Sequence, residues 1–204
     1  LAFLHTDTKS CSMKLEKLLF HSCRMGRREA RRVLGEGLVL VDGELERDPL
    51  RKVDEFTRLE VDGKVIQALE RRFYQVHKPA GYVSSTLREG HPTVLELLPE
   101  ELRAGLHYAG RLDLMSTGLM LLTNDGQWSR RLTEPSSHKG KVYRVELESP
   151  VEPTVHEVFA RGIYLAYEDH MSESCELELI DEKCVKLTLH EGKYHQIKRM
   201  FHAV

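Results

Sequence analysis

The 204-residue sequence lacks the features that mark several large classes of protein. No apolar run approaches the roughly 20 residues that cross a bilayer, and residues 1–12 lack the basic and apolar regions of a secretion signal. The four cysteines are scattered and form no zinc-binding pattern. A glycine-rich phosphate loop and a histidine–acid metal spacing are also absent. These absences predict a cytoplasmic protein with reduced thiols, no membrane partner, no metal and no cofactor.

An overall excess of positive charge is also lacking, since the net charge is −2. A nucleic-acid partner can therefore be inferred only from local clusters. One segment, residues 24–32, holds five arginines and a single acid, and four of the arginines form one stripe if the segment is helical. Such a stripe suits a phosphate backbone, although charge alone leaves a solvated helix face equally open. The arginines are Arg24, Arg27, Arg28, Arg31 and Arg32.

Residues 13–66 predict a small module of helices and strands. Apolar residues at helical spacing predict one short helix near residues 15–19 and a second near residues 30–34. Strands are predicted at residues 38–41 and 58–61, and each is followed by Asp-Gly, a dipeptide typical of tight turns.

Residues 67–72 carry charges without an apolar period and predict a linker to a second domain at residues 73–204. That domain shows period-two alternation, which is typical of antiparallel strands with one apolar face. The expected strands lie at 142–147, 175–179 and 184–189, and the expected helices at 153–161 and 193–203. The sequence therefore predicts an α+β fold with a mostly antiparallel sheet.

One acid stands out within residues 110–126. Asp113 lies two residues after Arg111 and before an apolar run. A carboxylate in that position is partly desolvated and needs a cationic neighbour to stay ionised, as a nucleophilic or acid/base carboxylate also does. If the segment is a strand, Arg111 and Asp113 point the same way. A structural ion pair or a turn acid is the alternative.

Several ordered motifs in residues 73–204 resemble the RsuA branch of pseudouridine synthases, and residues 13–60 resemble an S4 RNA-binding domain. Any one motif alone is a weak signal, whereas their shared order is specific. The motifs are His77-Lys78-Pro79, His91-Pro92-Thr93-Val94, Gly110-Arg111-Leu112-Asp113, Thr123-Asn124-Asp125-Gly126, Lys141-x-Tyr143 and the run from Glu191 to Met200. In the S4-like part they are Arg27-Arg28-Glu29-Ala30 and Val39-Leu40-Val41-Asp42-Gly43.

The resemblance implies isomerisation of uridine within RNA: the glycosidic N–C bond breaks, the base rotates, and a C–C bond forms to the same sugar carbon. No group is lost and nothing is oxidised, so no redox cofactor, nucleotide or metal is required. The reacting sugar carbon is hidden in a stacked helix, so the base must be extruded.

The resemblance also assigns roles to single residues. Asp113 attacks the sugar or assists departure of the base, Lys198 keeps that acid ionised, Tyr143 stacks on the target base, and Arg111 fills the gap left in the RNA stack. Lys78 and Arg199 are further expected RNA contacts. Without the resemblance, Lys198 and Arg199 would indicate a solvated helix face and Tyr143 a core aromatic. His77, His91 and His195 are assigned to framing the site or contacting RNA.

Subgroup details at residues 91–95, 125–129, 147–151 and 192–196 favour small-subunit (16S) ribosomal RNA as partner, free or in an assembled subunit, with a monomeric enzyme. Alternatives are a large-subunit (23S) enzyme of the same branch and a non-catalytic RNA-binding assembly factor. A carboxylate hydrolase is disfavoured because no second acid stands in an ordered motif. We expect residues 1–12 to be a disordered or non-native leader and the catalytic domain to be incomplete at its C-terminus.

Overall fold

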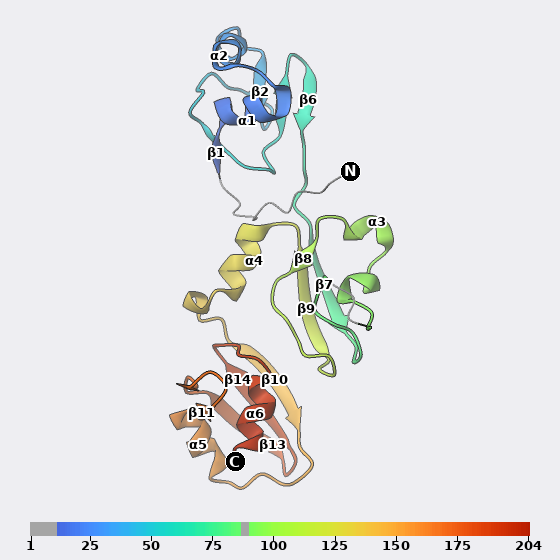
Figure 1. Cartoon of the computed structure of the whole chain (residues 1–204), viewed down its shortest axis with the longest axis vertical. Helices are drawn as coiled ribbons and strands as arrows, with labels where there is room; N and C mark the ends of the chain where they lie inside the picture. The colour runs from blue at the N-terminus through green and yellow to red at the C-terminus, as the bar shows by residue number, and fades with distance from the viewer. Residues whose placement is uncertain (1–11, 87–89) are drawn as a thin grey trace. The chain divides into compact units, whose positions relative to one another are not determined.

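The computed structural model describes residues 12–86 and 90–204 and divides the chain into two compact units, Leu1–Arg130 and Arg131–Val204 (Figure 1). The expected leader therefore lies outside the described residues, apart from Ser12. None of the helices in the described ranges combines the length and apolarity that a membrane span requires. Each unit is described below by itself.

The first part of unit 1 is built around the two short helices that the apolar spacing predicted and a four-stranded sheet that contains both predicted strands. Leu15, Leu19, Val39 and Leu59 are fully buried in one core. The sheet has the order β3-β2-β5-β6, with all neighbours antiparallel. Its elements are β1 (Met13–Lys14), α1 (Leu15–Cys23), α2 (Arg27–Gly35), β2 (Val39–Val41), β3 (Glu44–Leu45), β4 (Lys52–Val53), β5 (Leu59–Val61) and β6 (Lys64–Gln67).

Both Asp-Gly pairs form the tight turns that the sequence predicted. Asp42 and Gly43 have φ values of 54° and 86°, and Asp62 and Gly63 have φ values of 49° and 71°. Two successive residues in the left-handed region match the turn that joins twisted antiparallel strands, and Asp-Gly is a preferred sequence for it. The turns therefore set the pairing of β2 with β3 and of β5 with β6.

The second part of unit 1 is a three-stranded antiparallel sheet of order β7-β9-β8. Val94, Leu106, Met120 and Leu122 form its buried core. The elements are β7 (Phe73–Lys78), η1 (Val94–Leu97), α3 (Glu100–Arg103), β8 (His107–Tyr108) and β9 (Gly118–Thr123), and α4 (Gly126–Thr133) follows at the boundary of the two units.

The segment before β9 differs from the sequence-based expectation. Residues 111–117 form a loop and not a strand, because β9 begins only at Gly118. Gly110 and Gly118, with φ values of 108° and 132°, bracket the loop, and the Ser116 amide donates to the Asp113 carbonyl within it. Glycine adopts such backbone without the steric cost that other residues meet. The condition on which Arg111 and Asp113 were expected to point the same way, a strand at these residues, is therefore not met.

Arg71 joins the two parts of unit 1. Its Nη2 lies 2.7 Å from an Asp54 carboxylate oxygen, and its Nε lies 3.0 Å from one of Asp125. The guanidinium also stacks over the Phe56 ring at 4.4 Å. A planar cation with several donors is suited to bridge two carboxylates in this way. The division into domains at residues 66 and 73 remains a prediction.

Unit 2 is a three-stranded antiparallel sheet of order β10-β14-β13 with a short β11–β12 hairpin and two helices. Phe159, Leu187 and Met200 are fully buried at its centre. The strands and helices follow the predicted positions within a few residues, and the fold class is confirmed. The elements are η2 (Pro135–Ser137), β10 (Lys141–Glu146), α5 (Val155–Arg161), β11 (Tyr164–Leu165), β12 (His170–Met171), β13 (Glu176–Asp181), β14 (Cys184–Leu189) and α6 (Gln196–His202).

Candidate active site

Asp113 lies half-buried in a loop that is fastened on both sides to the segment after β7. The Ser84 hydroxyl donates to the Leu112 carbonyl at 2.9 Å and lies 3.1 Å from the Leu112 amide. The Gly81 amide donates to the Leu114 carbonyl at 2.9 Å. The backbone immediately before and after Asp113 is therefore fixed, which limits where its carboxylate can lie.

Lys78 forms a buried cation beneath the same loop. Its side chain is 0% exposed, and its Nζ donates to the carbonyls of Pro79 at 3.2 Å, Leu114 at 2.9 Å and Ser116 at 2.6 Å. An ammonium group has three donors, so all three are used. Burial lowers the pKa of Lys78, and the Asp113 carboxylate acts in the opposite direction. Lys78 thus stabilises the loop and lies within electrostatic range of Asp113.

The expectation that Lys78 contacts RNA was therefore wrong. A lysine side chain is usually exposed. Its position at the last residue of β7 instead turns the side chain inward, where the loop carbonyls replace water as acceptors. A group with no exposed surface cannot reach a phosphate without disrupting the loop.

The surface around Asp113 is open and partly apolar. Arg111 is exposed, and two large apolar side chains of the same segment, Met115 and Leu119, are also exposed. Sequence reasoning did not single out these two residues. Arg111 is thus accessible to a ligand, and its role in filling the RNA stack remains a prediction.

In unit 2, Tyr143 lies on β10 opposite Leu187 of β14. It is half-buried and packs against the core together with Val145, whereas Val142 and Arg144 point to the exposed face. The alternation of β10 is as predicted. The packing agrees with the core-aromatic alternative for Tyr143, and its role in stacking on the base remains a prediction.

Lys198 is exposed in the first turn of α6. Two buried side chains, a carboxylate and an amide, stabilise the loop that precedes this helix. Glu191 accepts hydrogen bonds from Gln196 Nε2 at 2.6 Å and from the Glu173 amide at 3.0 Å. Gln196 in turn accepts from the Lys193 amide at 2.9 Å. Both Glu191 and Gln196 are buried. Sequence reasoning included them in a motif but missed this bracing role.

Arg199 forms a two-pronged ion pair with Glu168 across 31 residues of sequence, at 2.6 and 2.8 Å. The hydrogen bond with Arg199 lowers the pKa of Glu168. Both terminal nitrogens of Arg199 are thus engaged within unit 2, and a direct phosphate contact would have to compete with that pair. RNA binding by Arg199 remains a prediction that this geometry disfavours.

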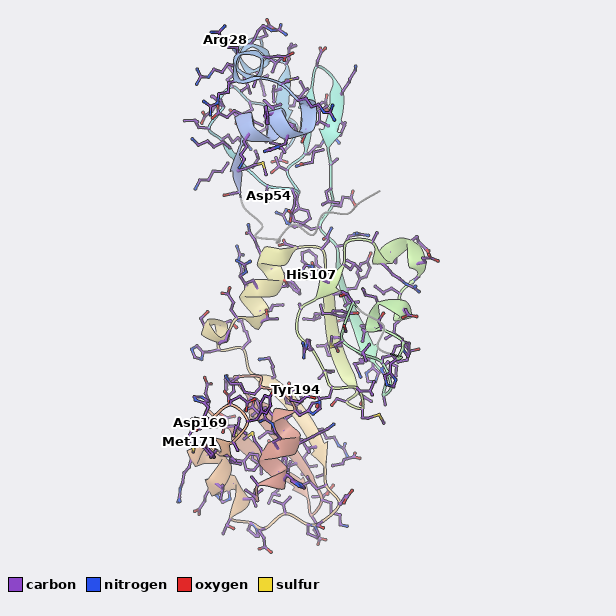
Figure 2. The ribbon with its side chains drawn as sticks, in the orientation of Figure 1. Arg28, Asp54, His107, Asp169, Met171 and Tyr194 are labelled. Atoms are coloured by element: carbon purple, nitrogen blue, oxygen red, sulfur yellow. The ribbon has the colours of Figure 1, made fainter. Side chains whose placement is uncertain are left out.

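The five arginines of the basic segment are all exposed, at the end of α1 and along α2. Arg32 pairs with Glu36 at 2.9 Å, and Figure 2 marks Arg28 on α2. A cavity of about 540 Å³ lies beside Arg27. Its other lining residues are Lys14, Glu16, Lys17, Phe20, His21 and Gly26. Cations next to exposed aromatic rings suit a nucleic-acid backbone and its bases.

The framing role or RNA contact expected of His77, His91 and His195 remains a prediction. His77 and His91 are exposed, and His195 stacks on Tyr194 with ring centroids 3.9 Å apart. Trp128 packs edge-on against Phe73 at 5.0 Å. In residues 12–86 and 90–204, no group of three or more metal-ligating side chains could hold an ion.

The candidate catalytic residues thus fall into two sets, one in each unit. Unit 1 carries Arg111 and Asp113, and unit 2 carries Tyr143 and Lys198. Within unit 1, the Asp113 carboxylate acts electrostatically on the buried Lys78 ammonium group, an interaction that the sequence analysis did not predict.

Residues 72–203 match the family described as RNA pseudouridylate synthase. The chain belongs to this family. It is 48% identical over 190 residues to ribosomal small subunit pseudouridine synthase A of Pseudomonas aeruginosa, covering 93% of this chain and 83% of that protein. It is 43% identical over 193 residues to the protein of the same name from Escherichia coli, with coverage of 94% and 84%. The resemblance drawn from the motifs is confirmed at the family level.

A solved structure supports the same conclusion. A protein described as a pseudouridylate synthase superposes with a TM-score of 0.64 at 35% sequence identity, over 94% of this chain and 83% of that one. The family membership makes the chain an isomerase-family protein that acts on RNA, as the sequence predicted. The S4 identity of residues 13–66 remains a prediction.

Proposed function

We propose that this chain isomerises a uridine of small-subunit ribosomal RNA to pseudouridine. The observation that carries the proposal is the Asp113 loop, whose backbone is fastened on both sides of the carboxylate by Ser84, Gly81 and buried Lys78. A carboxylate fixed before substrate arrives is what a nucleophilic or base-assisting acid requires. The names of the relatives favour the small subunit over the large one as the source of the RNA.

In the proposed reaction, the Asp113 carboxylate acts on the ribose of an everted uridine, either by attack on the sugar or by assisting departure of the base. Lys198 supplies a cation to the site, and the Tyr143 ring stacks on the uracil while it rotates. Arg111, exposed two residues from Asp113, takes the vacated place in the RNA stack. The product has the same atoms as the substrate, so the chemistry calls for no cofactor.

We propose that the basic face of α2 binds a part of the RNA that lies away from the reacting nucleotide. Its arginines are exposed and presented on a rigid helix, which favours phosphate contacts that position the RNA without reading its sequence. Residues 13–66 would then act as an S4 domain. We further propose that the protein acts as a monomer in the cytoplasm, where its RNA substrate is made.

The test of the proposed function is Asp113→Asn, which keeps the size of the side chain and removes its charge. We expect no pseudouridine in small-subunit RNA after incubation with this variant, as mapped by a chemical reaction specific for pseudouridine. Binding of the RNA should stay close to wild type. Asp62→Asn is the matched control, because Asp62 lies in an exposed turn whose left-handed backbone asparagine also tolerates.

Product formation by Asp113→Asn at the wild-type rate would exclude the assigned carboxylate. If wild-type protein binds the RNA but forms no pseudouridine in free RNA or in assembled subunits, the non-catalytic alternative replaces the proposal.

A further inference from the structure

Exposed aromatic rings gather on unit 2, beside the residues assigned to the reaction. Tyr167, in the turn between β11 and β12, is 80% exposed, and Tyr194, before α6, is 60% exposed. Their ring centroids lie 6.3 Å apart, and Tyr194 stacks on His195 with 20° between the planes. Tyr194 is labelled in Figure 2, as are Asp169 and Met171 of the hairpin. Tyr167, Tyr194 and His195 are called the aromatic surface below.

The aromatic surface is held in a fixed shape. The ion pair between Arg199 and Glu168 ties the hairpin turn to α6, and the Arg199 guanidinium lies 5.7 Å from the Tyr167 ring centroid. Asp169 and His195 both have left-handed backbone, with φ values of 49° and 47°. Rings that are fixed before a ligand binds lose little further conformational freedom, which favours affinity.

The charges around the aromatic surface suit an anionic partner. Lys193 and Lys198 are exposed on either side of the Tyr194–His195 pair. The two neighbouring carboxylates are both hydrogen-bonded within the unit, Glu168 to Arg199 and Asp169 to the Tyr164 hydroxyl at 2.5 Å. Flat rings next to lysine ammonium groups match bases next to phosphates.

We propose that the aromatic surface stacks on an unpaired nucleobase of the substrate RNA, next to the uridine that reacts. The proposal rests on the proposed function. Lys198 lies three residues after His195, so the aromatic surface begins within one helical turn of the cation assigned to the reaction. Eversion of a uridine removes a stacking partner from its neighbours, and an aromatic side chain can replace it. A protein partner fits less well, because lysine is depleted at protein interfaces.

The first experiment measures RNA affinity for Tyr167→Ala and Tyr194→Ala. The RNA is the shortest small-subunit fragment in which wild-type protein forms pseudouridine or, if none reacts, the fragment that it binds most tightly. Base–aromatic stacking is worth about 1–3 kcal/mol per base, so each variant should bind about 5- to 150-fold more weakly. Tyr→Phe at either position keeps the ring and should keep the affinity. Ile180→Ala is the matched control, since Ile180 is 50% exposed on β13 of the same unit and carries no ring.

The second experiment removes single bases from the RNA. Abasic nucleotides are placed in turn on both sides of the target uridine, or along the bound fragment. At one position, wild-type protein should lose affinity by a factor similar to that of the alanine variants. The Tyr167→Ala or Tyr194→Ala protein should lose little more at that position, because the base and the ring belong to one interaction.

The outcomes separate this inference from the proposed function. Coupling between base and ring supports the aromatic surface, even if no pseudouridine forms. Alanine variants that bind as tightly as wild type and still form product overturn it and leave the proposed function intact. The inference is also overturned if the affinity loss of an alanine variant and that of the abasic RNA simply add. It is overturned as well if the alanine variants lose affinity only for assembled ribosomal subunits, which contain protein, and not for the RNA fragment.

Discussion

Replacing Lys78 by methionine tests whether a buried cation positions the catalytic loop. Methionine fills nearly the same space, but it removes the charge and three hydrogen bonds to carbonyls. Each such charged bond contributes about 1.5–3 kcal/mol. Methionine also avoids the cost of removing an ammonium group from water on folding, which offsets several kcal/mol of that loss. We therefore expect a net loss of only about 1–3 kcal/mol in the free energy of unfolding.

The effect of Lys78→Met on turnover should be much larger. The variant frees the Ser116 carbonyl and leaves the Leu114 carbonyl bonded to the Gly81 amide alone. A displacement of about 1 Å in a catalytic group can lower the rate about 100-fold. Single-turnover rates at saturating RNA measure this loss. Thermal unfolding measures the stability, with an expected fall of about 2 to 12 °C in melting temperature. Lys78→Arg should not restore the rate, since the larger, planar guanidinium does not fit a fully buried ammonium site.

Two results would refute the reasoning about Lys78. One is a wild-type rate in folded Lys78→Met protein. The other is that same rate together with weaker, less salt-dependent RNA binding, which would in addition restore Lys78 as a phosphate contact.

Two further predictions concern unit 1. Alanine at three arginines of α2 should weaken RNA binding and lower the slope of log affinity against log salt by about 0.7 for each phosphate that the protein no longer neutralises. Arg161→Ala, at an exposed arginine of α5, should change neither the affinity nor the slope. An unchanged slope in the triple variant would exclude α2 from the RNA interface. The three positions are Arg27, Arg28 and Arg31. Arg71→Met should destabilise the protein by about 1–2 kcal/mol. It should also reduce acid sensitivity: burial raises the pKa of Asp125, but the Trp128 amide and Arg71 outweigh this and lower it. The stability from Asp125 is complete above pH 3.8 and is lost as pH falls below that value through the folded-state pKa. Urea unfolding of the wild-type and Arg71→Met proteins above and below pH 3.8 measures this difference in acid sensitivity. Identical pH dependence in the two proteins would contradict the prediction.

Local sequence patterns predicted the helices α1, α2, α5 and α6 and the strands β2, β5, β10, β13 and β14. The Asp42-Gly43 and Asp62-Gly63 pairs and the alternation in β10, β13 and β14 depend on neighbouring residues alone, so they can be read without knowing the fold. The acid at the centre of the site was likewise found from its own surroundings in the sequence, together with the family motifs.

Contacts between distant segments escaped the sequence-based reasoning. Lys78 meets Leu114 and Ser116 across more than 30 residues, and Arg199 meets Glu168 across 31. Composition gives no sign of either pairing, because a lysine or an arginine is usually expected at the surface. The loop character of residues 111–117 was also missed. The apolar run that follows suggested a strand over these residues, whereas β9 begins only at Gly118.

The pairing of β7 with β9 has a consequence for the Asp113 loop. Lys78 is the last residue of β7 and faces Gly118, the first residue of β9, while His77 faces Leu119. A slip of one residue would turn the lysine outward and present an imidazole to the carbonyls, with at most two N–H donors in place of three. The loop therefore depends on the alignment of two strands as well as on the contacts of its own seven residues, so a change that misaligns the sheet would also displace the acid.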